Sequence, residues 1–191
     1  MTLTPDARAL AVNLAGWVLC AACIPAVLVL RSRRAPQSPW LQGILRFLAV
    51  WAPVAAANWL VQAIGTLLFG APPASQDVLR EFANASVLRQ TFIAAAAILL
   101  MPGIEEWVFR ERLQSWLVRK TNLPWGIALT TLAFAAAHLT PSALLPLSVL
   151  AVGLSLCRIQ TGRLLPCIVM HALYNATSLA FLLLLGPSAL A

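Results

Sequence analysis

The sequence predicts an all-α fold, a polytopic transmembrane helix bundle of about six spans, because it holds several apolar runs of the about 20 residues that a membrane helix needs. Of its 191 residues, 61% are hydrophobic and only 10% are charged, and the mean hydropathy is +0.85. A soluble domain is about 45–50% apolar and about 25% charged. We therefore expect residues 1–191 to form a single integral membrane domain surrounded by the lipid bilayer.

The spans follow one another with short polar breaks. The first two apolar runs are residues 9–30 and 44–70, and the basic stretch Arg31-Ser-Arg-Arg34 stops the first. A polar stretch at 71–90 closes this N-terminal part, residues 1–90. The remaining apolar runs, within residues 91–191, are 91–104, 123–139, 143–156 and 164–185.

The net charge of +7 is explained by membrane topology. If the loop after the first span faces the cytoplasm, ten of the 13 Lys and Arg residues fall at inner ends of spans, as the positive-inside rule requires. Both termini are then expected outside. The basic residues are scattered between apolar runs and form no patch, which argues against nucleic-acid binding.

Cys20 and Cys23 form a C-x-x-C pattern and share a helix face. Such a pair is compatible with a metal or redox role. The favoured interpretation is two small apolar core residues, because no second Cys pair with ligand spacing exists.

The stretch GIEEWVFRERL at 103–113 places charged residues next to apolar sequence that is typical of a membrane span. Intramembrane ionisable residues face the bundle interior, pair with one another and mark function. Glu106 and Arg110 are four apart and share a helix face, so they are expected to pair as a structural brace. Glu105 points about 100° away and is predicted to stay free. The alternative is a solvated amphipathic helix end at the inner interface.

The only two histidines also lie in or at the ends of apolar runs. His138 shares a helix face with Phe134, and His171 shares one with Asn175, each pair four residues apart. Burying these polar groups together is the least costly arrangement in lipid.

One carboxylate, two imidazoles and an amide suit the hydrolysis of an amide bond. Glu and His can deprotonate and orient a water, and His and Asn donors can hold a developing oxyanion. Alternatively, Glu105, His138 and His171 could ligate one zinc ion, as two His and one Glu do in some metalloproteases. The sequence alone leaves both mechanisms open.

The ordered motifs Glu105-Glu106-x-x-x-Arg110, Phe134-x-x-x-His138 and His171-x-x-x-Asn175 resemble those of the CPBP family, the CAAX-protease and bacteriocin-processing intramembrane proteases, also called Abi or type II CAAX prenyl endopeptidases. The resemblance covers roughly residues 102–185, inside the predicted catalytic core.

This resemblance implies the following roles. Glu105 and His138 would activate the water, and His171 and Asn175 would form the oxyanion hole. Glu106, Arg110 and Phe134 would support the site. It also implies a glutamate-dependent mechanism without a cofactor, a membrane-associated peptide or protein substrate, and a prokaryotic cell membrane as the location.

Two other classes of function remain. One is a non-catalytic immunity or transport-accessory protein that binds a peptide with the same cluster, although a binder has little use for both a base and an oxyanion hole. The other is a proton-coupled carrier using Glu105, which the lack of an inverted repeat disfavours.

The depths of the motifs in the membrane impose a further expectation. If a span ended near Arg110, Glu105 would lie about 8 Å from the inner face and His138 about 22 Å from it. A helix break at Pro102-Gly103, with a second helix from about Gly103 to Lys120, would bring Glu105 to about 22 Å as well. Glu105 is therefore expected to start a helix.

Overall fold

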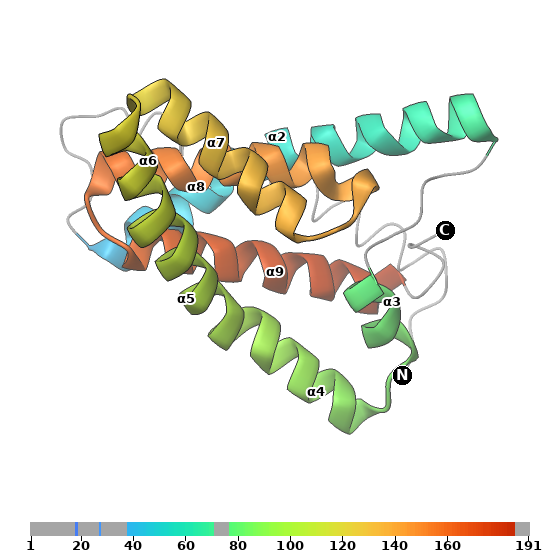
Figure 1. Cartoon of the computed structure of the whole chain (residues 1–191). Helices are drawn as coiled ribbons and strands as arrows, with labels where there is room; N and C mark the ends of the chain where they lie inside the picture. Colours follow the sequence, from blue (N-terminus) through green and yellow to red (C-terminus); the bar gives the residue numbers. More distant parts are fainter. Residues whose placement is uncertain (1–17, 19–26, 28–37, 71–76, 186–191) are drawn as a thin grey trace.

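The computed structural model describes residues 18, 27, 38–70 and 77–185, and every regular element among them is a helix (Figure 1). The α-helices are α2 (Pro39–Phe69), α3 (Asp77–Asn84), α4 (Val87–Ala95), α5 (Met101–Glu106), α6 (Ser115–Lys120), α7 (Leu123–Ala137), α8 (Leu144–Thr161) and α9 (Leu165–Leu185). The predicted span at 9–30, apart from Val18 and Val27, lies outside the described residues, as do Cys20, Cys23 and both termini.

Four of the described helices are long and apolar enough to cross a membrane, which confirms the predicted class of fold. They are Pro39–Phe69, Val87–Lys120, Pro141–Thr161 and Leu165–Leu184, and the apolar helix Leu123–Ala137 is shorter. The predicted spans at 44–70 and 164–185 correspond to α2 and α9. The predicted short run at 143–156 extends to Thr161, where Gly162 ends the helix in the left-handed conformation (φ 65°).

The predicted helix break at Pro102-Gly103 is wrong. Residues Val87–Lys120 form one uninterrupted helical run, so Glu105 lies inside a helix and does not start one. The turn Ala96–Leu100 is a π-helix, in which the N–H of Met101 donates to the carbonyl of Ala96, five residues earlier. This wider turn accommodates Pro102, which lacks an N–H and would clash with the carbonyl four residues before it in an α-helix.

Part of the predicted polar loop at 71–90 is also helical. Helix α3 buries Phe82 against Leu179 and Leu182 of α9. Its exposed face is tied to the start of α4 by an ion pair between Glu81 and Arg89, with Nη2 to Oε1 at 2.5 Å. Figure 1 shows α3 between the C-terminal end of α9 and the N-terminal end of α4.

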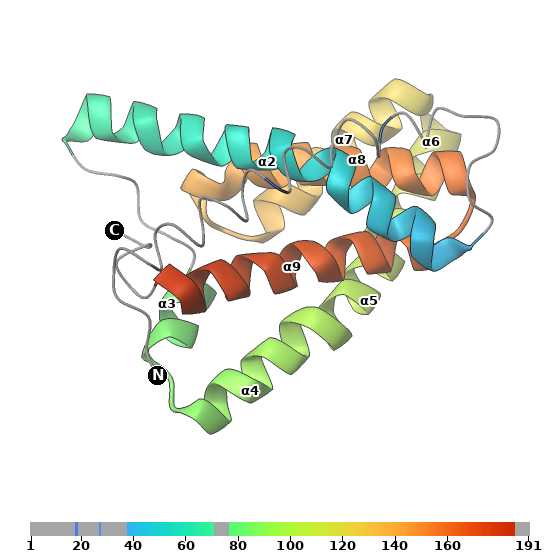
Figure 2. The ribbon, with the colours of Figure 1, turned by 180° about the vertical axis from the view of Figure 1, so that it is seen from behind.

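The main core lies between α2, α8 and α9, which run side by side in both views (Figures 1 and 2). Phe47, Val54, Leu150, Leu154 and Met170 are buried there. The helices approach closely at glycines, as small residues allow in membrane bundles. A Cβ atom at Gly43 of α2 would lie 2.6 Å from Cβ of Val169 on α9.

Basic residues gather at one end of the bundle. Helix α6 ends with Arg119 and Lys120, and Arg158 lies in the last turn of α8. At the same end, Nη2 of Arg46 on α2 donates to Oε1 of Gln160 at 3.4 Å. This is the end at which α6 meets the start of α7 and α8 meets the start of α9 (Figure 1).

Candidate active site

Glu106 and Arg110 form the pair that their spacing predicted. Nη1 of Arg110 donates to Oε1 of Glu106 at 3.0 Å, and both side chains are completely buried, at 0% exposure. The same oxygen lies 2.8 Å from Nδ1 of His171 on α9. A buried charge is tolerated only when it is paired and hydrogen-bonded, so Glu106 serves as the anchor that joins α5 to α9.

Glu105 occupies a different environment from its neighbour. Its side chain is 20% exposed, and its Oε2 atom lies 3.7 Å from Nε2 of His171. That oxygen is buried but has no hydrogen-bond partner among the described residues. The two adjacent glutamates therefore flank one imidazole, with Glu106 held on Nδ1 and Glu105 facing Nε2 without a hydrogen bond.

Phe134 of α7 packs at the centre of these polar groups and is completely buried. The guanidinium carbon of Arg110 lies 4.3 Å from its ring centroid, a cation–π contact. The ring centroids of His138 and His171 lie 4.8 and 5.8 Å from that of Phe134. Phe134 thus contacts one residue of each of the other motifs and sets their spacing.

His138 lies at the C-cap of α7, where its ring is partly buried. Its Nδ1 atom lies 2.9 Å from the carbonyl oxygen of Phe134. Because a carbonyl can only accept, Nδ1 carries the hydrogen in this contact, and the neutral ring then has its lone pair on Nε2. This tautomer suits a general base.

Asn175 lies one turn after His171 on α9, but its amide contacts the backbone of another helix. Nδ2 donates to the carbonyl oxygen of Ala97 at 2.8 Å. In the widened register of this π-helical turn, the carbonyl of Ala97 would accept from residue 102, which is a proline. Asn175 therefore supplies a donor that the backbone lacks.

The two glutamates lie between two π-helical segments, Ala96–Leu100 and Trp107–Gln114. Such segments are rare and occur frequently at functional sites, because they rotate the following side chains relative to a regular helix. The Glu105-Glu106 pair is consequently carried on a short α-helical piece, Met101–Glu106, whose orientation depends on both flanking turns.

The structure thus joins Glu105, Glu106, Arg110, Phe134, His138 and His171 in one network of contacts, whereas Asn175 is tied to Ala97. Two participants did not emerge from the sequence. Phe109 packs edge-to-face on Phe134, with centroids 5.2 Å apart, and its place beside Arg110 was the one available signal. Pro102 was identified only as a break, although it creates the need for Asn175.

Within the described part of the chain, no three His, Cys, Asp or Glu side chains are grouped as ligands for a metal ion. The set suggested for zinc was Glu105, His138 and His171. Nδ1 of His171 faces Glu106, and Nδ1 of His138 faces a backbone carbonyl. These contacts leave Nε2 of each histidine as the only ring nitrogen that could ligate a metal ion, as in zinc sites where Nδ1 donates to a carboxylate or a carbonyl.

Comparison with known proteins agrees with the motifs. Residues 87–177 match the family described as type II CAAX prenyl endopeptidase Rce1-like. No curated protein and no solved structure matches the chain significantly. The matched segment begins with α4 and includes all of the site residues named above, from Glu105 to Asn175. Residues 87–177 are therefore similar to the domain of the Rce1-like type II CAAX prenyl endopeptidases, a family of proteases.

Proposed function

We propose that this protein hydrolyses a peptide bond of a membrane-associated substrate by means of a water molecule that Glu105 and His138 activate. The observation that carries the proposal is the difference between the two adjacent glutamates. Glu106 is fully buried and contacts Arg110 and His171, so we assign it a structural role. Glu105 is 20% exposed, and its contact with Nε2 of His171, at 3.7 Å, is longer than a hydrogen bond, so its carboxylate can accept a proton from water.

In the first step, Glu105 and His138 share the removal of a proton from water while its oxygen attacks the scissile carbonyl carbon. Nε2 of His138 is the nitrogen with the lone pair, because Nδ1 is bound to the carbonyl of Phe134. The new C–O bond forms as the carbonyl π bond breaks, which leaves a negative charge on the carbonyl oxygen. Collapse of this tetrahedral species expels the amine, which takes the proton that Glu105 or His138 received.

His171 is the group best suited to stabilise the oxyanion. It is flanked by two carboxylates, at 2.8 Å on Nδ1 and 3.7 Å on Nε2, which hold the orientation of the ring. A ring N–H directed at the developing oxyanion is an electrostatic stabiliser of the type that lowers barriers most in a low-dielectric site. Asn175 contributes through its second N–H, because the first is engaged by Ala97.

The substrate class follows from the family and from the position of the site within apolar helices. We propose a peptide held at the membrane, either a prenylated C-terminal tail, a peptide precursor or a C-terminal sorting anchor. The site contacts lie among α5, α7 and α9 and their connecting turns, all within apolar segments. A substrate that carries its own lipid or apolar segment reaches such a site from within the bilayer.

The decisive test uses the purified chain in lipid vesicles with three peptides, a farnesylated tail, a secreted-peptide precursor and a sorting anchor. Products are identified by mass spectrometry in H₂¹⁸O, because direct attack by water places one ¹⁸O in the new carboxylate. We expect wild-type protein to cleave at least one peptide and Glu105→Gln to cleave none. Glu81→Gln, an exposed carboxylate on α3, is the matched control and retains full activity.

The same assay separates the remaining alternatives. Cleavage that persists after incubation with a chelator supports the metal-free mechanism, whereas loss that added Zn²⁺ restores contradicts it. Full cleavage by Glu105→Gln would refute the assigned base. Crosslinking of an uncleaved peptide to both wild type and Glu105→Gln would instead support a peptide-binding protein.

A further inference from the structure

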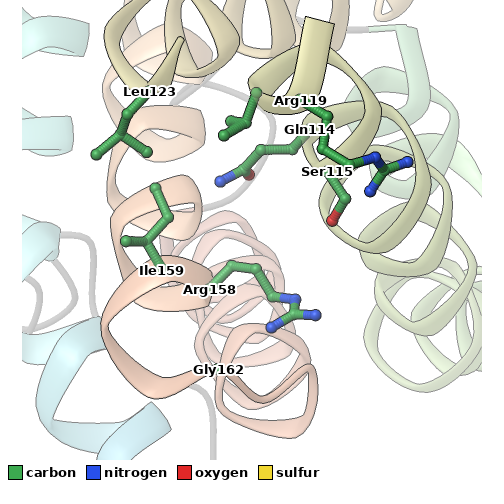
Figure 3. Close-up of a pocket in the computed structure, with 8 residues that line it drawn as sticks. Gln114, Ser115, Arg119, Leu123, Arg158, Ile159 and Gly162 are labelled. Atoms are coloured by element: carbon green, nitrogen blue, oxygen red, sulfur yellow. The ribbon is translucent and has the colours of Figure 1, made fainter.

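A pocket lies at the basic end of the bundle (Figure 3). Its volume is about 330 Å³, and its walls come from the last turns of the Val87–Lys120 run and of α8. The lining residues are Gln114, Ser115, Val118, Arg119, Leu123, Arg158, Ile159 and Gly162. The side chains of the site network, from Glu105 to Asn175, do not line this pocket, although Oγ of Ser115 donates to the backbone carbonyl of Arg110 at 3.4 Å.

One side of this pocket carries positive charge. Figure 3 shows the guanidinium groups of Arg119 and Arg158 on the same side of the pocket. Nη2 of Arg158 pairs with Oε2 of Glu111 at 2.7 Å, while its buried Nε has no partner among the described residues. Arg119 is exposed and forms no ion pair within the described chain. The single carboxylate of Glu111 does not balance the guanidinium groups of Arg119 and Arg158, so this side of the pocket carries a net positive charge.

The opposite side is apolar. Leu123 and Ile159 lie across the pocket from the guanidinium groups (Figure 3), and both are more than one third exposed. The pocket is lined by residues within one or two turns of Lys120 and Thr161, where two of the membrane-spanning helices end. A cationic wall that faces an apolar wall near the ends of such helices matches an anionic lipid, in which a charged headgroup adjoins an apolar chain.

Gln114 adds a polar group at the pocket's inner wall. Its side chain is almost fully buried, and Nε2 donates to the carbonyl oxygen of Ser155 at 3.2 Å. Its Oε1 atom is buried and has no donor among the described residues. A buried acceptor without a donor is destabilising, so a ligand that brings a hydroxyl group next to its phosphate would satisfy it.

We propose that this pocket binds the headgroup of one anionic phospholipid. The phosphate contacts Arg119 and Arg158, a headgroup hydroxyl donates to Oε1 of Gln114, and the start of an acyl chain lies along Leu123 and Ile159. Phosphatidylglycerol has all three features, and phosphatidylcholine lacks both the net charge and the hydroxyl. A lipid so bound would join the Val87–Lys120 run to α8, as the Arg158–Glu111 pair already does.

The lipid site is separate from the catalytic cluster. Arg119 follows Arg110 by nine residues, on the order of 13 Å along the helix axis. The proposal therefore does not depend on the assigned protease chemistry. It can be tested on purified protein by a binding measurement that needs no substrate.

The test is native mass spectrometry of the detergent-purified chain titrated with phosphatidylglycerol or phosphatidylcholine. We expect one phosphatidylglycerol to be retained per chain, at least fivefold more tightly than phosphatidylcholine. Arg119→Gln, which breaks no ion pair, should weaken this binding about fivefold or more, as loss of one lipid-facing arginine does. Lys120→Gln is the matched control, with the same change of charge one residue away and outside the pocket.

A separate arm distinguishes the lipid from its soluble headgroup. Glycerol 3-phosphate at millimolar concentration should compete weakly, because it lacks the chain that contacts Leu123 and Ile159. Equal retention of the two lipids, equal effects of Arg119→Gln and Lys120→Gln, or glycerol 3-phosphate binding as tightly as the lipid would each overturn the proposal. Thermal unfolding of each variant checks that the bundle is intact.

Discussion

His171 and Glu106 are joined across α9 and α5 by a contact of 2.8 Å between Nδ1 and Oε1. The same carboxylate oxygen accepts a hydrogen bond from Arg110 at 3.0 Å. Glu106, Arg110 and His171 therefore form one buried unit in which each member offsets the desolvation of another. The unit fixes the imidazole that faces Glu105, so the stability of the bundle and the geometry of the site depend on the same three side chains.

Replacing Glu106 should destabilise the fold much more than replacing Glu105. Glu106→Gln leaves the fully buried Arg110 without its counter-charge, which costs about 3–5 kcal/mol of unfolding free energy. Glu105→Gln removes a partly exposed carboxylate whose buried oxygen accepts no hydrogen bond from the described residues, and it should cost less than about 1 kcal/mol. Denaturant unfolding in mixed micelles measures both values.

A second variant tests the cause of that loss. If the unpaired charge of Arg110 is responsible, Glu106→Gln combined with Arg110→Met should be more stable than Glu106→Gln alone. An equal or lower stability of the double variant would mean that the cost comes from the lost contact with His171 instead.

His138 should matter for rate and little for folding. Its ring is partly exposed, and among the described residues the ring's one hydrogen bond is to the carbonyl of Phe134, four residues earlier in the chain. Because His138 is proposed to be part of the general base, His138→Ala should lower kcat about 10²–10⁴-fold. The melting temperature should move by only a few degrees. A kcat within threefold of wild type would exclude His138 from proton transfer.

Much of this architecture could be predicted from local patterns. Four apolar runs mark four of the long helices, and the four-residue spacing of Glu106 and Arg110 predicted a pair that the structure contains at full burial. Both features depend on a few residues of one segment. Helix-face arguments also separated Glu105 from Glu106, because adjacent residues in a helix point about 100° apart.

The errors arose where distant segments decide the outcome. Pro102 is a helix breaker by its local chemistry, and the break predicted there follows from that property alone. In the structure the preceding turn widens, and the carbonyl that loses its donor is bonded by Asn175, 78 residues away. The spacing of His171 and Asn175 likewise predicted a shared face, but not that the amide would be engaged by Ala97.

Two glycines provide a matched test of the packing. A Cβ atom at Gly43 would lie 2.6 Å from Cβ of Val169 and 2.8 Å from the carbonyl oxygen of Pro166, whereas at Gly103 it would meet nothing within 4 Å. Gly43→Ala should therefore cost about 1–3 kcal/mol by separating α2 from α9. Gly103→Ala should be neutral or stabilising by up to about 1 kcal/mol, since alanine favours a helix interior. Unfolding of the two variants side by side checks this, and equal losses would contradict the close contact of α2 with α9.

The bond between Asn175 and Ala97 predicts a coupling with Pro102. Asn175→Leu removes the donor to the Ala97 carbonyl and should cost about 1–3 kcal/mol, as an unsatisfied acceptor does. Pro102→Ala restores a backbone N–H, and in the register of this turn, where Met101 bonds to Ala96, that N–H points to the Ala97 carbonyl. The double variant should therefore lose about 1 kcal/mol less unfolding free energy than the sum of the losses of the single variants.

Asn175→Leu with Gly103→Ala is the control, and its two losses of unfolding free energy should be additive within about 0.5 kcal/mol. Additivity of the Asn175–Pro102 pair as well would show that Asn175 does not replace the missing backbone donor.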